Sequence, residues 1–237
     1  MLYRAARHLL FQFDPETAHA LSLKSLCMLE RAGLAGLVAA PVMPRPVRAM
    51  GLDFPNPLGL AAGMAKHTEY VDGLGALGFG FLELGGVTPR PQPGNPRPRV
   101  FRLPAAEAII NRLGFNSVGV DQFVANLRKA RYRGIVGINL GKNKDTPNER
   151  AAGDYAASLE KVYPLAHFAT INISSPNTAD LRRLQAPEHL APLLAAMHGL
   201  RERLAQKHGR RVALAVKIAP DIDDSGIATL ARIAVEQ

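Results

Sequence analysis

Four polar side chains follow a short β-branched run and could hold a polar, planar ligand. The run from Phe168 to Ile173 predicts a buried strand, and Asn172, Ser175, Asn177 and Thr178 come at its carboxyl end. Their amides and hydroxyls offer hydrogen-bond donors and acceptors at the end of the strand. For this segment alone, a polar turn that only ends a strand is the alternative interpretation.

Similar clusters follow the other strands that the sequence predicts. They are Ala61–Lys66, Gly85–Thr88, Gly141–Lys144, and Lys217 within the fifth strand. Their glycines let the backbone approach a flat ligand closely, while Lys66 and Lys217 supply positive charge from two sides. The clusters together predict one polar, glycine-lined pocket, with ordinary salt bridges as the alternative role of the lysines.

Alternating strands and helices must hold these clusters in place. Strands are predicted near Leu58–Ala61, Gly80–Leu84, Ile135–Leu140, Ala169–Ile173 and Val212–Ile218. Helices are predicted near Thr68–Leu77, Gly119–Arg131, Asn148–Val162, Pro187–His208 and Asp223–Val235. Five successive βα units indicate an α/β protein with a parallel sheet.

Each predicted strand ends in a glycine or polar cluster, which favours a (β/α)8 TIM barrel with its site at the carboxyl ends of the strands. A doubly wound sheet is the alternative, but no Gly-x-Gly-x-x-Gly leads from a strand into a helix. Gln237 falls inside the helix after the fifth strand. We therefore expect an incomplete barrel of about five βα units, a portion of a longer protein that lacks the last three.

The beginning of the chain predicts a separate helical segment. Leu2–Phe13 is basic and apolar, and Asp14-Pro15-Glu16 supplies a cap, a first-turn proline and an early acid for a second helix ending near Ala32. Apolar residues cover most of this second helix. We divide the chain into residues 1–42, which meet a membrane surface, the main domain or both, and residues 43–237, the barrel domain.

Composition and charge restrict the class of protein. The chain has 237 residues, a net charge of +9 and one cysteine, Cys27. Its basic residues lack interleaved aromatics, which argues against nucleic-acid binding, although five arginines between Val87 and Phe115 could meet an anionic ligand or membrane surface. A single cysteine fits a reducing, cytoplasm-facing compartment. No apolar run reaches the roughly 18–20 residues of a membrane span, and we expect no metal.

Five longer blocks of sequence carry a specific resemblance. They are Asn56–Gly63, Val87–Asn95, Asn111–Asn116, Gly137–Asn143 and Asn172–Thr178. These blocks resemble dihydroorotate dehydrogenase, and the similarity covers essentially the whole chain. Serine at position 175, together with the N-terminal helical pair, resembles the class 2, membrane-associated, quinone-dependent enzymes, whereas the soluble class 1 enzymes carry cysteine there.

The resemblance implies oxidation of dihydroorotate to orotate in pyrimidine (UMP) biosynthesis, with FMN as redox cofactor and a membrane quinone as electron acceptor. The residues expected to bind FMN are Ala62, Gly63, Met64, Ala65, Lys66, Gly86, Asn139, Asn172 and Lys217. The residues expected to bind the substrate are Lys66, Asn111, Arg112, Leu113, Gly114, Phe115, Asn172 and Asn177. Ser175 would remove the C5 proton with help from Thr178, and Lys217 would stabilise the reduced flavin.

The same resemblance assigns the N-terminal segment to the quinone. His19 and Arg102 would contact the quinone head, in a peripheral membrane protein at the cytoplasmic face of the inner cell membrane. On this view residues 1–40 serve only the quinone step, and removing them would leave flavin reduction nearly intact.

Two places depart from the family pattern. Ala65 stands where an acid is common and is followed by His67-Thr68 where a glycine-containing variant is usual, and Gly86 stands where a hydroxyl residue often bonds the flavin. Two alternative functions remain. One is another FMN-dependent barrel oxidoreductase that acts on a pyrimidine, and the other is a non-catalytic, truncated flavin-barrel fragment that binds at the membrane periphery.

Overall fold

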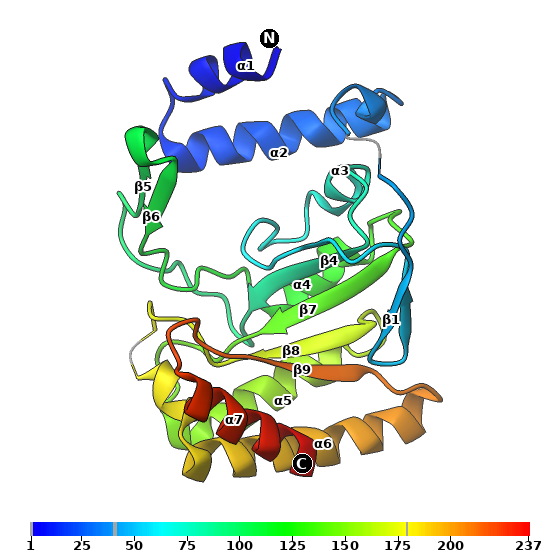
Figure 1. Cartoon of the computed structure of the whole chain (residues 1–237), viewed down its shortest axis with the longest axis vertical. Coiled ribbons are helices and arrows are strands. Elements are labelled where there is room, and N and C mark those ends of the chain that lie inside the picture. Colours follow the sequence, from blue (N-terminus) through cyan, green and yellow to red (C-terminus); the bar gives the residue numbers. More distant parts are fainter. Residues whose placement is uncertain (1, 40–41, 179) are drawn as a thin grey trace.

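The computed structural model describes residues 2–39, 42–178 and 180–237, and a parallel sheet forms its centre (Figure 1). The strands are β3 (Gly59–Leu60), β4 (Phe81–Val87), β7 (Ile135–Leu140), β8 (Phe168–Asn172) and β9 (Ala213–Lys217), paired in the order β3-β4-β7-β8-β9. This order follows the chain without a reversal, whereas a doubly wound sheet reverses at a switch point. The incomplete (β/α)8 barrel predicted from the sequence is therefore confirmed.

Helices cover the outer face of this sheet. They are α3 (Val71–Gly75), α4 (Val120–Leu127), α5 (Ala151–Val162), α6 (Pro187–His208) and α7 (Asp224–Glu236), with short 3-10 turns η3 (Asn148–Arg150) and η4 (Leu181–Gln185). Figure 1 shows α5, α6 and α7 packed together along one side of the sheet. Alternate strand residues such as Leu82, Leu84, Ile138 and Ile171 are fully buried. Their side chains build the core between sheet and helices.

The inner face of the sheet is aromatic at one end and polar at the other. The rings of Phe54 and Phe81 lie 5.2 Å apart and those of Phe81 and Phe168 lie 5.8 Å apart, both edge to face. Gly137 makes room for this layer, because a Cβ atom there would come within 2.0 Å of the Phe168 ring. The rings lie at the amino ends of the strands, which leaves the polar side chains at the carboxyl ends, where barrel enzymes place their sites.

Two helices precede the barrel strands. In α2 (Pro15–Arg31), the carboxylate of Asp14 caps the first turn by accepting from the backbone N–H of Glu16 at 3.0 Å. This helix packs tightly on α3, since a Cβ atom at Gly73 would lie 2.9 Å from the backbone nitrogen of Cys27. The preceding α1 (Leu2–Leu10) lies above α2 in Figure 1, and η1 (Ala35–Leu37) follows α2.

Two hairpins were not predicted from the sequence. They are β1 (Val47–Ala49) with β2 (Leu52–Phe54), and β5 (Val100–Leu103) with β6 (Ala108–Asn111), the second closed by η2 (Pro104–Ala106). Met50 and Gly51 join the first pair with φ angles of 52° and 76°, a turn that suits the twist of a hairpin. Their strands are short and mostly exposed, so they lack the alternation that marks a strand.

Candidate functional site

Polar side chains from three neighbouring strands form one hydrogen-bonded chain on the inner face of the sheet. Asn139 of β7 donates through Nδ2 to the carboxylate of Glu83 on β4, at 2.8 Å. Asn172 of β8 donates through Nδ2 to Asn139 Oδ1 at 2.9 Å. Asn172 Oδ1 accepts from the backbone N–H and the hydroxyl of Ser174 at 3.1 and 2.9 Å. The chain also reaches the first strand-end cluster, because the Ala62 N–H donates to Glu83 at 3.3 Å.

This chain has a fixed direction. A carboxylate only accepts hydrogen bonds, and a backbone N–H only donates them. Glu83 at one end and the Ser174 N–H at the other therefore fix which atom of each amide faces its neighbour. Asn139 is fully buried and Asn172 nearly so, which makes any reversal costly. The buried amides thus present a single, predetermined pattern of donors and acceptors.

The turn after β8 carries the predicted catalytic hydroxyls. Ser175 Oγ is half-buried and accepts a hydrogen bond from the Asn177 N–H at 3.3 Å, while Thr178 is buried. Tyr155 of α5 supports the turn from below by donating its hydroxyl to the Asn172 carbonyl at 2.8 Å, and burial raises the pKa of this tyrosine. On the next strand, Lys217 is the register partner of Asn172 and is exposed.

The first strand-end cluster places Lys66 near the same region. Lys66 Nζ donates to Asn116 Oδ1 at 2.9 Å. Burial lowers the pKa of Lys66 to about 8, and the charge of Arg99 acts in the same direction, while Glu16 acts against it. The backbone is tied to β4 by the Gly63 N–H, which donates to the Gly85 carbonyl at 2.8 Å.

The two residues that depart from the family pattern at positions 65 and 68 are both buried, and each has specific contacts. Ala65 is 3% exposed and belongs to the apolar core, and its carbonyl accepts from the Gly85 N–H at 3.1 Å. Thr68 has a φ angle of 59°, a left-handed conformation that favours glycine. Its hydroxyl donates to the Phe123 carbonyl at 2.9 Å, and this bond offsets part of the backbone strain.

Glycine at position 86 is explained by Phe115. A Cβ atom at Gly86 would lie 2.4 Å from the Phe115 ring, and one at Gly141 would lie 2.3 Å from it. The ring therefore occupies the space that a side chain at position 86 would need. Phe115 itself has a φ angle of 58°, so its backbone is strained to deliver the ring to this place.

Hydrogen bonds from the loop of residues 92–95 hold the predicted substrate segment Asn111–Phe115. Asn95 holds it twice, donating from its backbone N–H to the Leu113 carbonyl at 3.0 Å and from Nδ2 to the Arg112 carbonyl at 2.8 Å. Gln92 Nε2 donates to the Phe115 carbonyl at 2.8 Å. The guanidinium of Arg112 donates to the Pro98 carbonyl, at 3.0 Å from Nη2. The Arg112 guanidinium is thus already bonded to the backbone, whereas the Lys66 ammonium lies beside Asn116, next to this segment. Of these two cations, Lys66 is the better placed to meet an anionic group bound at the segment.

Of the two predicted quinone residues, Arg102 lies on the hairpin β5–β6 beside the end of α1, and His19 lies on α2 near Met64. Arg102 donates to the Phe13 carbonyl at 2.9 Å, and its guanidinium stacks 4.5 Å from the centre of the Phe11 ring. His19 stays exposed on α2. Partial desolvation lowers the pKa of its imidazole, and the Met64 backbone opposes this shift.

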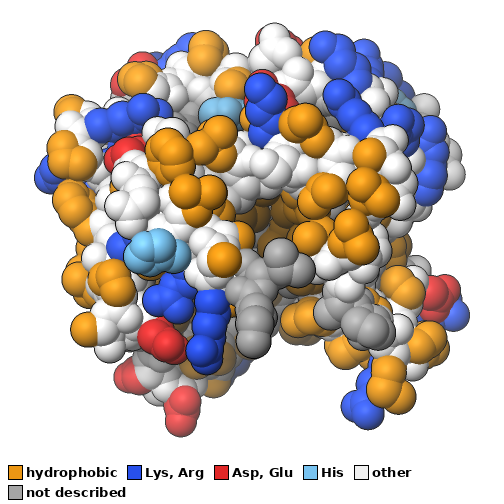
Figure 2. Space-filling view, turned by 90° about the horizontal axis from the view of Figure 1, so that it is seen from above, with side chains coloured by type: hydrophobic (Ala, Val, Ile, Leu, Met, Phe, Trp, Pro, Cys, Tyr) orange, Lys and Arg blue, Asp and Glu red, His pale blue; other side chains and the backbone are white. Residues whose placement is uncertain are grey.

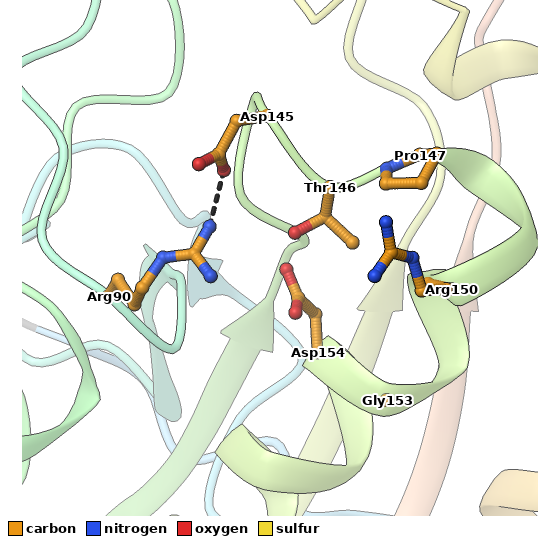
Figure 3. A pocket seen from close by; sticks show the side chains of 7 residues that line it. All are labelled: Arg90, Asp145, Thr146, Pro147, Arg150, Gly153 and Asp154. Atoms are coloured by element: carbon orange, nitrogen blue, oxygen red, sulfur yellow. Dashed lines mark hydrogen bonds and ion pairs between the residues drawn. The ribbon is translucent and has the colours of Figure 1, made fainter.

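A separate polar cavity lies beside the strand-end clusters (Figure 3). Its volume is about 490 Å³, and its lining consists of Arg90, Asp145, Thr146, Pro147, Arg150, Gly153 and Asp154. Figure 3 shows the ion pair between Arg90 and Asp145, which both line it. Because two arginines face two aspartates, the walls carry no excess of either charge. None of the predicted site residues lines this cavity.

The structure brings Ala62, Asn139, Asn172 and the turn Ser175–Thr178 together, and it adds two residues that sequence reasoning missed. Glu83 and Ser174 terminate the hydrogen-bonded chain. An acid between two buried leucines in β4 is a recognisable signal, because such a strand position rarely carries a charge without a partner. Among the described residues, no group of histidine, cysteine and acidic side chains could hold a metal ion.

Comparisons with known proteins place these residues in a family. A family model described as dihydroorotate dehydrogenase matches residues 46–237. The Azotobacter vinelandii protein named dihydroorotate dehydrogenase (quinone) is 58% identical over 231 residues, which are 98% of this chain and 67% of the relative. The Burkholderia cenocepacia protein of the same name is 60% identical over 226 residues, which are 95% of this chain and 66% of the relative.

A solved structure gives the same result. The crystal structure of DHODH from Eimeria tenella in complex with ferulenol superposes with a TM-score of 0.80 at 36% identity, covering 94% of this chain and 64% of that one. The chain therefore spans about two thirds of the length of these relatives. With the family model matched along the barrel and the strand-end clusters in one parallel sheet, the chain belongs to the dihydroorotate dehydrogenase family.

Proposed function

We propose that the full-length protein oxidises dihydroorotate to orotate with FMN as redox cofactor and passes the electrons to a membrane quinone, in the synthesis of UMP. The observation that carries this proposal is the directed chain Glu83–Asn139–Asn172–Ser174, which ends next to Ser175. It offers buried amides to a planar ligand beside a hydroxyl that can act as a base. The names of the close relatives support the same activity.

The residues at the strand ends fit FMN in their chemistry. The flavin pyrimidine ring has carbonyl and N–H edges that match the amides of Asn139 and Asn172. Lys217, paired in register with Asn172, would favour negative charge on that ring. Gly86 leaves only a backbone N–H at its position, because the Phe115 ring fills the space of a side chain. When bound, FMN would accept two electrons from the substrate.

Ser175 would act as the base at the C5 position of dihydroorotate. A serine hydroxyl is a weak base, so its own proton must move away toward Thr178 as Oγ accepts the C5 proton. The Asn177 N–H, which already donates to Ser175 Oγ at 3.3 Å, would favour the departure of that hydroxyl proton by stabilising the alkoxide character that it leaves on Oγ. Thr178 would pass the proton onward.

The substrate carboxylate would bind near Lys66. This amine is mostly buried and already donates to Asn116 at the end of the segment Asn111–Phe115. Among the described residues its hydrogen-bond partner is an amide and no carboxylate pairs with it, and such a buried ammonium ion gains more from an anionic ligand than an exposed one does. Asn177 and the backbone of Asn111–Phe115 would provide the remaining polar contacts.

The membrane side of the proposal rests on α1 and α2. Tyr3 and Leu9 of α1 are 75% and 64% exposed, and Arg4 and Arg7 share that helix. Figure 2, which looks onto this end of the molecule, shows apolar side chains among lysines and arginines. Apolar and basic side chains in one helix suit a peripheral site on an anionic bilayer, here the cytoplasmic face of the inner membrane. Within residues 2–39, 42–178 and 180–237, no helix is long and apolar enough to cross a membrane.

Two half-reactions test the proposed function. The full-length protein is purified, its flavin is identified by absorbance and mass, and dihydroorotate is added without oxygen. Loss of the flavin absorbance, followed by its return on addition of a long-tail quinone, is expected. A flavin that only another pyrimidine reduces would indicate a different oxidoreductase, and a protein that holds no flavin would indicate a non-catalytic barrel.

A further inference from the structure

An ion pair fastens the first turn of α2 to the barrel. The Glu16 carboxylate accepts from Arg99 Nη2 at 2.9 Å and from Arg99 Nε at 3.1 Å. Arg97 Nε adds a third contact to the same carboxylate at 3.0 Å. The Arg99 side chain is 8% exposed and that of Glu16 is 17% exposed. A paired guanidinium this deeply buried depends on its carboxylate, because an unpaired buried charge is strongly unfavourable.

The remaining donors of Arg99 hold the loop that carries the substrate segment. Arg99 Nη1 donates to the carbonyls of Pro93 and Asn95, at 2.7 and 3.0 Å. Asn95 in turn binds the Leu113 and Arg112 carbonyls. The backbone packs closely there, since a Cβ atom at Gly114 would lie 2.5 Å from Asn95 Cγ.

A second backbone contact reinforces this connection. The Arg112 N–H donates to the Arg99 carbonyl at 2.8 Å, so residue 99 holds the segment through its main chain as well as through its side chain. Glu16, Arg99, the loop of residues 93–95 and the segment Asn111–Phe115 thus form an unbroken series of hydrogen bonds.

We propose that Glu16 is a positioning residue for dihydroorotate, because it holds Arg99 where the loop of residues 93–95 fixes the segment Asn111–Phe115. The inference rests on the proposed function and adds to it. It assigns the N-terminal helical segment a part in substrate affinity and not in the quinone step alone. It therefore predicts that removing residues 1–40 weakens dihydroorotate binding, whereas the quinone role alone predicts that flavin reduction stays nearly intact.

The electrostatics of Lys66 give this role a second signature. Arg99 lowers the pKa of Lys66 and Glu16 raises it. Removing the charge of Glu16 leaves Arg99 uncompensated, so Lys66 loses its proton at a lower pH than in the wild type. A purely structural role of Glu16 would weaken binding without moving this titration.

The matched control lies on the same helix. Glu30, near the other end of α2, accepts from Arg131 Nη2 at 2.7 Å and likewise ties the helix to the barrel. Arg131 makes no contact with the substrate segment or its loop among its hydrogen bonds and ion pairs within the described part of the chain. Glu16→Gln and Glu30→Gln therefore each remove one anchoring charge of α2, and only the first touches the proposed connection.

The test uses full-length protein with bound flavin, and measures orotate affinity by titration calorimetry together with the pH profile of kcat/KM for dihydroorotate. For Glu16→Gln we expect orotate to bind at least ~10-fold more weakly, equivalent to about 1.4 kcal/mol, with the alkaline fall of kcat/KM moved to lower pH. Glu16→Asp, which restores the charge, should recover part of the affinity. Glu30→Gln should match the wild type in both measurements.

The outcomes separate this inference from the proposed function. Equal orotate affinity in Glu16→Gln and wild type would overturn the positioning role of Glu16. Equal weakening in Glu16→Gln and Glu30→Gln would also overturn it, because substrate affinity would then depend only on the packing of α2 against the barrel. Flavin content and circular dichroism establish that each variant is folded. Failure of the wild type to reduce its flavin with dihydroorotate would instead reject the proposed function.

Discussion

Replacing Glu83 with glutamine should disrupt the polar chain along its whole length. Glutamine keeps the size of the side chain but exchanges one acceptor oxygen for a donor NH2 group. If that group faces the Ala62 N–H, two donors meet there. If it faces Asn139, the amides of Asn139 and Asn172 must reverse in turn, and the conflict moves to the Ser174 N–H, which cannot reverse. One donor pair stays unsatisfied in every arrangement.

The size of the effect follows from that single conflict. An unsatisfied buried donor costs about 1–3 kcal/mol, and for proteins of moderate size each kcal/mol lowers the midpoint of thermal unfolding by roughly 2–4 °C. Flavin retention should fall as well, since the amide pattern no longer has one stable orientation. Thermal unfolding of full-length protein and its flavin content after gel filtration are the two measurements.

The control for this experiment is Asp53→Asn. Asp53 also loses a charge, but its side chain is 75% exposed and its ion pair with Arg48 is long, at 3.7 Å. Exposed pairs of this kind contribute little to stability. If Glu83→Gln unfolds at the same temperature as Asp53→Asn and keeps its flavin equally well, the chain does not have the fixed direction inferred from its hydrogen bonds.

Three further predictions concern the same region. Gly86→Thr should destabilise the protein by about 1–3 kcal/mol and weaken dihydroorotate binding, because the new side chain displaces the Phe115 ring; unchanged unfolding and KM would contradict this. The kcat/KM for dihydroorotate should fall as pH rises through about 8, where Lys66 loses its charge, and Lys66→Arg should move that fall to higher pH. Tyr155→Phe leaves the Asn172 carbonyl without its hydroxyl donor, so thermal unfolding should report a loss of about 1–3 kcal/mol, and a loss near zero would refute the supporting role of Tyr155.

The charged form of Lys66 lowers the free energy of unfolding of the protein. Its pKa in the folded protein lies below that of a free lysine, so the charged form is less favourable in the folded state. The cost is fully present below about pH 8 and disappears as pH rises toward the ordinary lysine value. Lys66→Met should therefore stabilise the protein at neutral pH while it impairs substrate binding, which is the combination expected of a functional residue.

The barrel units could be predicted because their signals are local. The predicted bounds Ile135–Leu140 and Pro187–His208 agree with β7 and α6, since a continuous apolar run and a capped, periodic helix are both visible in sequence. The hairpin β5–β6 could not be found in this way. Its strands pair with each other away from the core, so their pattern carries no clear alternation of apolar and polar residues.

The sequence predicted which residues lie in the candidate site better than it predicted the hydrogen bonds between them. Because barrel sites lie at the carboxyl ends of the strands, Asn172, Ser175 and Lys217 could be assigned to one region. The hydrogen-bonded order Glu83–Asn139–Asn172–Ser174 depends on the register between strands, which no single segment of sequence contains. The link from Glu16 to Arg99 joins residues far apart in the chain and depends on how α2 docks. The division at residues 42 and 43 stays a prediction, as do the roles of His19 and Arg102.

The most direct test of the central claim compares two adjacent serines. Ser175→Ala removes the proposed base, whereas Ser174→Ala removes a hydroxyl whose place in the chain is partly kept by the Ser174 N–H. In stopped-flow measurements on full-length, flavin-bearing protein, Ser175→Ala should slow flavin reduction by dihydroorotate roughly 10²- to 10⁴-fold, the usual contribution of a general base. Ser174→Ala should remain close to the wild type. Reduction of the Ser175→Ala flavin at a rate near that of the wild type would contradict the account.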